Sequence, residues 1–144
     1  MIALVISDVH ANLEALDRVL EDAGVRGYDE VWFLGDAVGY GPDPNACVER
    51  MRALEPRIWL AGNHDWAALG RLDLTAFNPE PRRATEWTGA ALSVEVRAFL
   101  ETREPRAEAA DLTWVHGSPR HPIWEYILDS GIAAASFEAF QTGL

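Results

Sequence analysis

Four short clusters of polar residues could carry chemistry, and each follows a short apolar run in the sequence. They are residues 8–10 (DVH), 35–36 (GD), 62–65 (GNHD) and 116–117 (HG). Carboxylates, an amide oxygen and imidazole nitrogens are ligands that divalent ions such as Mn, Fe, Ni and Zn accept. If the four clusters meet in space, they could therefore form a metal site.

The elements that would position these clusters alternate between strands and helices. Apolar runs predict strands at residues 2–6, 31–34, 58–61 and 112–115. Periodicity predicts helices at residues 13–24, 44–54, 93–102 and 133–140, and a loop with a short helical piece at residues 70–92. This alternation is typical of an α/β fold with a parallel sheet and right-handed crossovers. Because ligands bind beyond the carboxyl ends of such strands, the four clusters are expected at one edge of the sheet.

Five side chains in these clusters are candidate metal ligands: Asp8, His10, Asp36, Asn63 and His116. In an extended segment, the side chains of Asp8 and His10 would leave the backbone on the same side. The glycines around Asp36 would free the backbone so that the two carboxylate oxygens could bridge two ions. Taken singly, each residue has an ordinary structural explanation, such as a turn-forming Asp or a hydrogen-bonded His. Their shared position after strands favours the metal site.

The composition excludes several other classes of protein. The 144 residues, expected to form one domain over residues 1–144, carry a net charge of −11, which disfavours bulk binding of nucleic acid. Cys47 is the sole cysteine, so an internal disulfide is excluded. Residues 1–7 lack the basic leader of a signal peptide and the length of a membrane span, so a soluble, cytoplasmic protein is expected.

An acidic protein can still bind a phosphate ester where metal ions reverse the local field. Two divalent ions, ionised Asp8 and Asp36 and one bound hydroxide leave about one positive charge. That charge matches a phosphodiester anion, so a small phosphate ester is the expected substrate.

The motifs Asp-x-His, Gly-Asp-x-x-Gly, Gly-Asn-His-Asp and a later His-Gly together resemble the calcineurin-like metallophosphoesterase superfamily. The segments SDVHANLEAL and GDAVGYGPDP are similar to those of its small prokaryotic, phosphodiesterase-like members, and the resemblance covers about residues 4–128. It implies an αββα sandwich of two mixed sheets flanked by helices. It also implies a hydrolase with two divalent ions, Mn favoured, in which a metal-bridging hydroxide attacks phosphorus.

The resemblance also assigns roles to individual residues. Asp8 and His10 would bind a first ion, Asp36 would bridge, and a second ion would be bound by Asn63 and His116. His64 would face the substrate, where it stabilises phosphoryl transfer or protonates the leaving oxygen, and Asp65 would orient His64. Helix capping by Asp65 is the structural alternative. Asn12 is expected either to touch phosphate or to cap a helix.

One part of the superfamily pattern is absent from the sequence. No Gly-His-x-His motif follows His116, and the only later histidine, His121, lies in a segment RHP that reads as a loop. The resemblance therefore implies a C-terminally shortened sandwich with an incomplete second sheet and weakened metal binding. An exposed apolar sheet face would favour a homo-oligomer. A non-catalytic protein that binds phosphate or a partner, and a centre with a single metal ion, are the alternative hypotheses.

Overall fold

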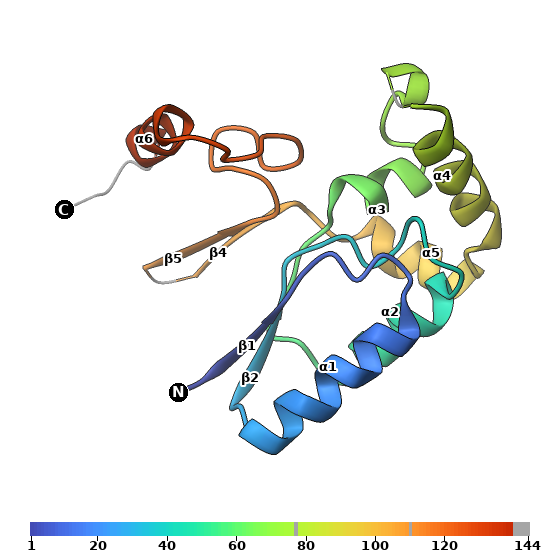
Figure 1. The fold of residues 1–144 in the computed structure, drawn as a ribbon, viewed down its shortest axis with the longest axis horizontal. Helices are drawn as coiled ribbons and strands as arrows, with labels where there is room; N and C mark the ends of the chain where they lie inside the picture. The colour runs from blue at the N-terminus through green and yellow to red at the C-terminus, as the bar shows by residue number, and fades with distance from the viewer. Residues whose placement is uncertain (77, 110, 140–144) are drawn as a thin grey trace.

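Three parallel strands and two helices form the first half of the fold. The computed structural model describes residues 1–76, 78–109 and 111–139. Strands β1 (Ala3–Ile6), β2 (Glu30–Phe33) and β3 (Ile58–Trp59) pair in that order, with Leu4 opposite Val31 and Phe33 opposite Trp59. Helices α1 (Leu13–Arg26) and α2 (Pro44–Arg52) connect these strands (Figure 1). The predicted βαβαβ order and parallel sheet are confirmed.

The start of α1 is fixed by the residue that precedes it. The backbone N–H of Ala15 donates to Oδ1 of Asn12 at 3.0 Å, so Asn12 is the N-cap of this helix. Its cap position holds the loop of residues 8–12 at the carboxyl end of β1. The capping alternative for Asn12 is therefore confirmed, and contact with phosphate stays a prediction.

The core lies between one face of the parallel sheet and the helices. Phe33 of β2 is fully buried, and its ring centroid lies 4.8 Å from that of Trp59 on β3. Trp59 lies in turn 4.8 Å from Phe99 of α5 (Val94–Glu101). Aromatic pairs in this edge-to-face range stabilise the packing beyond the area that they bury. The sheet and helices thus form a rigid base for the loops at the carboxyl ends of the strands.

A second, antiparallel sheet contains β4 (Arg106–Ala109) and β5 (Leu112–Val115). The ring of Trp114 on β5 lies 5.2 Å from that of Trp32 on β2, so the two sheets meet on the face opposite the helices. The expectation that residues 112–115 form a strand is confirmed, but the strand pairs with β4, which the sequence analysis missed. The arrangement matches the expected two-sheet α/β sandwich with few strands in the second sheet.

Residues 70–92 contain more helix than the sequence indicated. A 3-10 helix (Leu74–Ala76) is followed by the 13-residue helix α4 (Pro79–Ala91), so the expectation of a loop with only a short helical piece was wrong about the extent of the helix. Pro79 and Pro81 lie in the first turn of α4, where backbone N–H groups have no partner within the helix. Gly89 lets α4 pack closely on α3 (Asn63–Ala68), because a Cβ there would lie 2.6 Å from the carbonyl oxygen of Ala68.

The last described element is α6 (Ser130–Ala139), so the helix predicted for residues 133–140 is confirmed up to residue 139. Residue 140 lies outside the described residues. Residues 122–128, which precede α6, form a turn and an extended loop. Within the described parts of the chain, no helix is long and apolar enough to cross a membrane.

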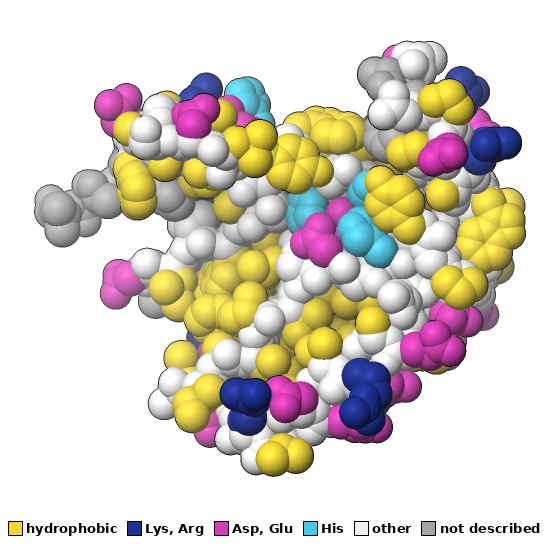
Figure 2. Space-filling view, in the orientation of Figure 1, with side chains coloured by type: hydrophobic (Ala, Val, Ile, Leu, Met, Phe, Trp, Pro, Cys, Tyr) yellow, Lys and Arg dark blue, Asp and Glu magenta, His cyan; other side chains and the backbone are white. Residues whose placement is uncertain are grey.

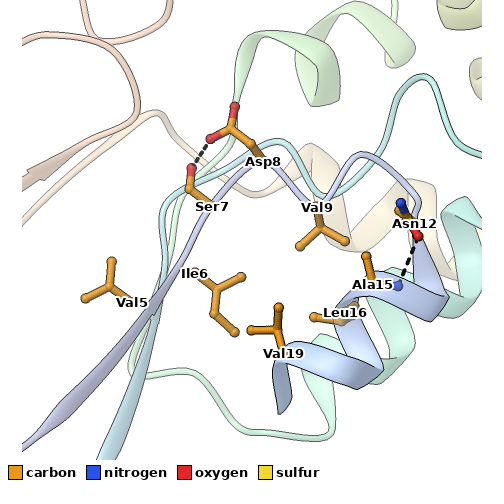
Figure 3. Close-up of a pocket in the computed structure, with 9 residues that line it drawn as sticks. All are labelled: Val5, Ile6, Ser7, Asp8, Val9, Asn12, Ala15, Leu16 and Val19. Atoms are coloured by element: carbon orange, nitrogen blue, oxygen red, sulfur yellow. Dashed lines mark hydrogen bonds between the residues drawn. The ribbon is translucent and has the colours of Figure 1, made fainter. Parts of the chain in front are cut away.

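A hollow of about 320 Å³ lies between β1 and α1 (Figure 3). Val5 and Val19 line this hollow, and each is 50% exposed. The apolar surface at the edge of β1 is therefore only partly covered within the described chain. Association into a homo-oligomer stays a prediction.

Candidate metal centre

The four polar clusters meet because the loops that carry them are bonded to one another. The backbone N–H of Asp8 donates to the carbonyl oxygen of Gly35 at 3.0 Å, and that of His10 donates to the carbonyl oxygen of Asp36 at 3.0 Å. The approach of the third loop requires glycine, because a Cβ on Gly62 would lie 2.0 Å from Oδ1 of Asp36. The convergence expected at the carboxyl ends of the parallel strands is therefore present for the first three clusters, whereas the fourth follows β5 of the antiparallel sheet.

The side chains converge on one carboxylate oxygen, Oδ2 of Asp36. Nε2 of His10 lies 3.7 Å and Nε2 of His116 lies 3.6 Å from this oxygen. Oδ1 of Asp8 lies 3.7 Å from Nε2 of His10, and Oδ1 of Asn63 lies 3.0 Å from Nε2 of His116. The five candidate ligands therefore form one continuous cluster with Asp36 at its centre. Figure 2 shows histidine and acidic side chains gathered on this face, bordered by hydrophobic side chains.

The cluster contains two overlapping sets of possible metal ligands. The ligand atoms of Asp8, Asp36 and His116 lie within 4.8 Å of one another, as do those of His10, Asp36 and His64. Asp36 is common to both sets, which is the position that a bridging ligand requires. The sets differ from the expected assignment, which placed Asp8 with His10 and gave His64 no metal.

The hydrogen bonds of the histidines test whether these residues fit a cation. Nδ1 of His116 contacts the carbonyl oxygen of Leu34 at 2.8 Å, and because a carbonyl only accepts, Nδ1 is the donor. In the neutral ring, Nε2 then carries the lone pair and faces another acceptor, Oδ1 of Asn63, at 3.0 Å. Nδ1 of His10 similarly faces the carbonyl oxygen of Val38 at 3.4 Å. Metal-binding histidines donate their second ring N–H in this way, so the residues present fit a divalent ion.

Three of the candidate ligands have a strained backbone. Asp8, His10 and Asp36 have φ values of 56°, 49° and 57°, in the left-handed region that side-chain-bearing residues seldom adopt. The expectation that Asp8 and His10 lie in an extended segment was therefore wrong. Their side chains meet because tight turns aim them at one point, and such strain is concentrated at functional sites.

Two carboxylates are buried at the centre, where a nearby positive charge would stabilise their ionised forms. Asp36 is 2% exposed and Asp65 is fully buried. Burial raises the pKa of Asp36 to about 7, with Asp8 adding to the rise and the backbone N–H of His64 opposing it. Burial, and then the charge of Asp36, also raises the pKa of Asp65. A cation beside these groups would reverse the effect, because it favours their ionised forms.

Asp65 ties the loops of the centre together. Its carboxylate accepts hydrogen bonds from the backbone N–H groups of Asp36 at 2.9 Å, Val38 at 3.1 Å and Gly62 at 2.9 Å. The bond from Gly62 caps α3, so the capping alternative is confirmed. The role of Asp65 in orienting His64 stays a prediction.

His64 lies between the candidate ligands and an aromatic side chain that the sequence analysis did not single out. Burial, followed by the neighbouring His10 and His116, lowers the pKa of His64 to about 4, so its ring is neutral at pH 7. The ring of Tyr40 lies 4.5 Å from that of His64 and 5.0 Å from that of His10. The only sequence signal for Tyr40 is its position in the glycine-rich segment GYG after the second strand.

His121 does not join the cluster formed by the other three histidines. It is an exposed loop residue whose carbonyl oxygen accepts from the backbone N–H groups of Trp124 and Glu125 at 3.2 Å. The expectation that His121 is a loop residue is therefore confirmed.

Comparison with known proteins identifies the family. The sequence model described as calcineurin-like phosphoesterase matches residues 1–129. A crystal structure of a metallophosphoesterase from Sphaerobacter thermophilus is 56% identical, with a TM-score of 0.84, and the match covers 97% of this chain and 56% of that chain.

Two curated relatives match over most of this chain. An uncharacterised protein of Methanocaldococcus jannaschii is 42% identical over 128 residues, which are 85% of this chain and 52% of the relative. A symmetrical bis(5′-nucleosyl)-tetraphosphatase of Glaesserella parasuis is 28% identical over 134 residues, which are 89% of this chain and 43% of the relative. The chain thus spans about half the length of the curated relatives that it matches.

Proposed function

Because the chain belongs to the calcineurin-like phosphoesterase family, we propose that it hydrolyses a small phosphate ester, in particular a phosphodiester, with two divalent ions. The proposed ligands are the five clustered side chains: Asp8, His10, Asp36, Asn63 and His116. Manganese is the favoured ion. The bis(5′-nucleosyl)-tetraphosphatase of Glaesserella parasuis supports hydrolysis at phosphorus as the reaction class.

The contact between His116 and Asn63 is the observation that carries this proposal. Nε2 of His116 lies 3.0 Å from Oδ1 of Asn63, although the hydrogen bond at Nδ1 leaves Nε2 without a proton in the neutral ring. In this arrangement two acceptors face each other, which a shared positive charge would stabilise. Nε2 also lies 3.6 Å from Oδ2 of Asp36, a second negatively polarised atom. Three such atoms around one point are the arrangement of a cation site.

When bound, divalent ions would lower the pKa of a water and neutralise charge on the phosphoryl oxygens. Asp36 would hold the centre together, because its Oδ1 accepts from the backbone N–H of His64 at 2.8 Å while Oδ2 faces both His10 and His116. Asp8 is more than half exposed at its side chain and forms the open, solvent-facing part of the ligand set. Substrate could therefore approach from that side.

His64 would act on the substrate through a hydrogen bond. Since its pKa is lowered to about 4, the ring is neutral at pH 7 and its N–H can donate to a phosphoryl or leaving oxygen. Nearby cations would lower that pKa further, which favours hydrogen bonding over full protonation of the leaving group. Asp65 would position His64 through the backbone, since it caps the helix on which His64 lies.

Metal content and hydrolysis of bis-p-nitrophenyl phosphate together test the proposal. We expect the protein to take up Mn and to release p-nitrophenol. The His64→Ala variant should retain metal and lose activity about 100-fold or more, as when a transition-state donor is removed. The His121→Ala variant is the matched control and should keep both properties.

Three results would decide between the proposal and the alternatives. Metal uptake without any hydrolysis would favour a protein that binds phosphate or a partner. Absence of both metal and hydrolysis would refute the proposal. One ion per chain, measured by elemental analysis, would support a mononuclear centre.

A further inference from the structure

A pocket of about 430 Å³ begins at the metal centre and runs toward the start of α4. Asn63 and His64 form its inner end. Its walls include three aromatic residues from two distant segments: Tyr40, Trp124 and Tyr126. This volume is within the range of roughly 300–1,000 Å³ that small-molecule sites occupy.

The three aromatic rings are not core residues. Tyr40 is 54% exposed, Trp124 is 43% exposed and Tyr126 is 67% exposed. Exposed aromatic side chains gathered around one pocket are typical of binding surfaces, because their flat faces can be covered by a ligand. Tyr40 also has a left-handed backbone, with φ of 55°, which is unfavourable for a bulky residue. The loop therefore holds the ring of Tyr40 against His64 at a conformational cost.

The charges of the side chains that line the pocket favour an uncharged ligand. Of the described side chains that line it, none is Lys or Arg, and one is the carboxylate of Asp73. The hydrogen bond from the backbone N–H of Thr75, at 2.8 Å, lowers the pKa of Asp73, so the group is ionised at neutral pH. A further phosphate would meet this carboxylate, and Arg82, the basic side chain whose charge acts on Asp73, is paired with Glu86. A heterocyclic ring with N–H groups could instead donate to Asp73.

A second polar side chain at the outer end of the pocket is suited to the same ligand. Asn78 occupies the N-cap position of α4, but its side chain makes no capping hydrogen bond. An amide that lines the pocket can both donate to and accept from the edge of a ring, as it does in recognition of nucleobases. The outer polar groups could therefore form hydrogen bonds to the edge of a ring, while the aromatic walls contact its faces.

We propose that this pocket binds an uncharged planar aromatic ring carried by the phosphate ester, with Tyr40, Trp124 and Tyr126 against the ring faces. The inference rests on the proposed phosphoesterase function and adds a substrate class to it. The ester phosphate would lie at Asn63 and His64, and the ring would extend toward Asp73. A nucleobase is a suitable test ligand, because it combines a flat aromatic face with N–H donors.

The test compares adenosine 5′-monophosphate with ribose 5-phosphate, which has the same phosphate ester but no base. Calorimetry with Mn-loaded protein measures both affinities, and phosphate release measures both values of kcat/KM. We expect at least about a fivefold preference for the nucleotide, because stacking of a base on aromatic side chains contributes about 1–3 kcal/mol. The Trp124→Ala and Tyr126→Ala variants should reduce this preference, whereas Trp124→Phe should retain most of it.

Trp87 of α4 provides the matched control, since it is 50% exposed and does not line the pocket. The Trp87→Ala variant should keep the preference unchanged. Equal binding and turnover of the two phosphates would overturn the inference and leave the proposed phosphoesterase function intact. Failure to bind or hydrolyse either phosphate, together with no hydrolysis of bis-p-nitrophenyl phosphate, would refute both.

Discussion

Replacement of Asp36 by Asn should stabilise the metal-free protein and remove its response to metal. Asp36 is 2% exposed, and its pKa is raised to about 7 chiefly by burial. Since the folded-state pKa exceeds the unfolded value of 3.8, ionisation of Asp36 destabilises the folded protein. The penalty is absent below that unfolded pKa, grows as the pH rises, and is fully present above about pH 7.

The size of the effect follows from the raised pKa. At pH 8 the buried charge costs the folded state about 4 kcal/mol. An Asn side chain retains an oxygen that can accept from the backbone N–H of His64, which donates to Oδ1 of Asp36 at 2.8 Å. Part of the gain is lost because that bond becomes neutral, so the net stabilisation should be about 2–3 kcal/mol. For a chain of this size that corresponds to a rise in Tm of roughly 5–10 °C.

Thermal unfolding at pH 8, with EDTA and then with excess Mn, provides the assay. In EDTA the Asp36→Asn variant should melt above the wild type, and at about pH 3, below the unfolded pKa, the two should coincide. With Mn at about 100 times its Kd, the wild type should gain about 2.7 kcal/mol and the variant nearly nothing. The Asp22→Asn variant is the control, because Asp22 is an exposed carboxylate on α1 that pairs only with Arg26 among the described groups.

The reasoning is refuted if the Asp36→Asn variant is less stable than the wild type in EDTA at pH 8. It is equally refuted if the variant and the wild type gain the same stability from Mn. Either result would mean that Asp36 is a structural residue rather than the centre of a cation site.

Two further substitutions test how the loops are held. The Asp65→Ala variant leaves three buried backbone N–H groups without their carboxylate acceptor, which costs about 3–9 kcal/mol, and relief of the buried charge of Asp65 offsets part of that cost. Urea unfolding should therefore show a net loss of stability. A loss below 1 kcal/mol would contradict this role. The Gly62→Ala variant places a Cβ 2.0 Å from Oδ1 of Asp36, so calorimetry should show about 10–100-fold weaker Mn binding. Unchanged affinity in a folded variant would show that the loops can move apart.

The parallel sheet and the position of the centre could be predicted because both depend on local patterns. Short apolar runs mark β1, β2 and β3, and the polar residues directly after them must lie at the carboxyl ends of parallel strands. The exact geometry of these residues could not be predicted from the sequence, since Asp8 and His10 meet through left-handed turns rather than an extended segment. Turn conformations at non-glycine residues leave no clear signal in a single sequence.

Two elements were missed for physical reasons. β4 has the sequence RAEA, with no apolar run, and it is a strand because it pairs with β5. α4 contains Pro79 and Pro81, which usually end helices but are tolerated in the first turn. The aromatic pocket was missed because Tyr40 and Tyr126 are distant in the sequence and meet only through the folding of the loops around the centre.

The buried carboxylates of the centre lower the stability of the metal-free protein, although the proposed function requires them. Burial raises the pKa values of Asp36 and Asp65, and the charge of Asp36 adds to the rise at Asp65, so ionisation of either group is costly in the metal-free protein. The hydrogen bonds to Asp65 and the close packing at Gly62 hold that arrangement in place. A residue that only stabilised the fold at position 36 need not be a carboxylate, because an apolar side chain there would need no compensating charge. The two buried carboxylates beside three histidines therefore support the proposed cation site, because a bound cation would favour their ionised forms.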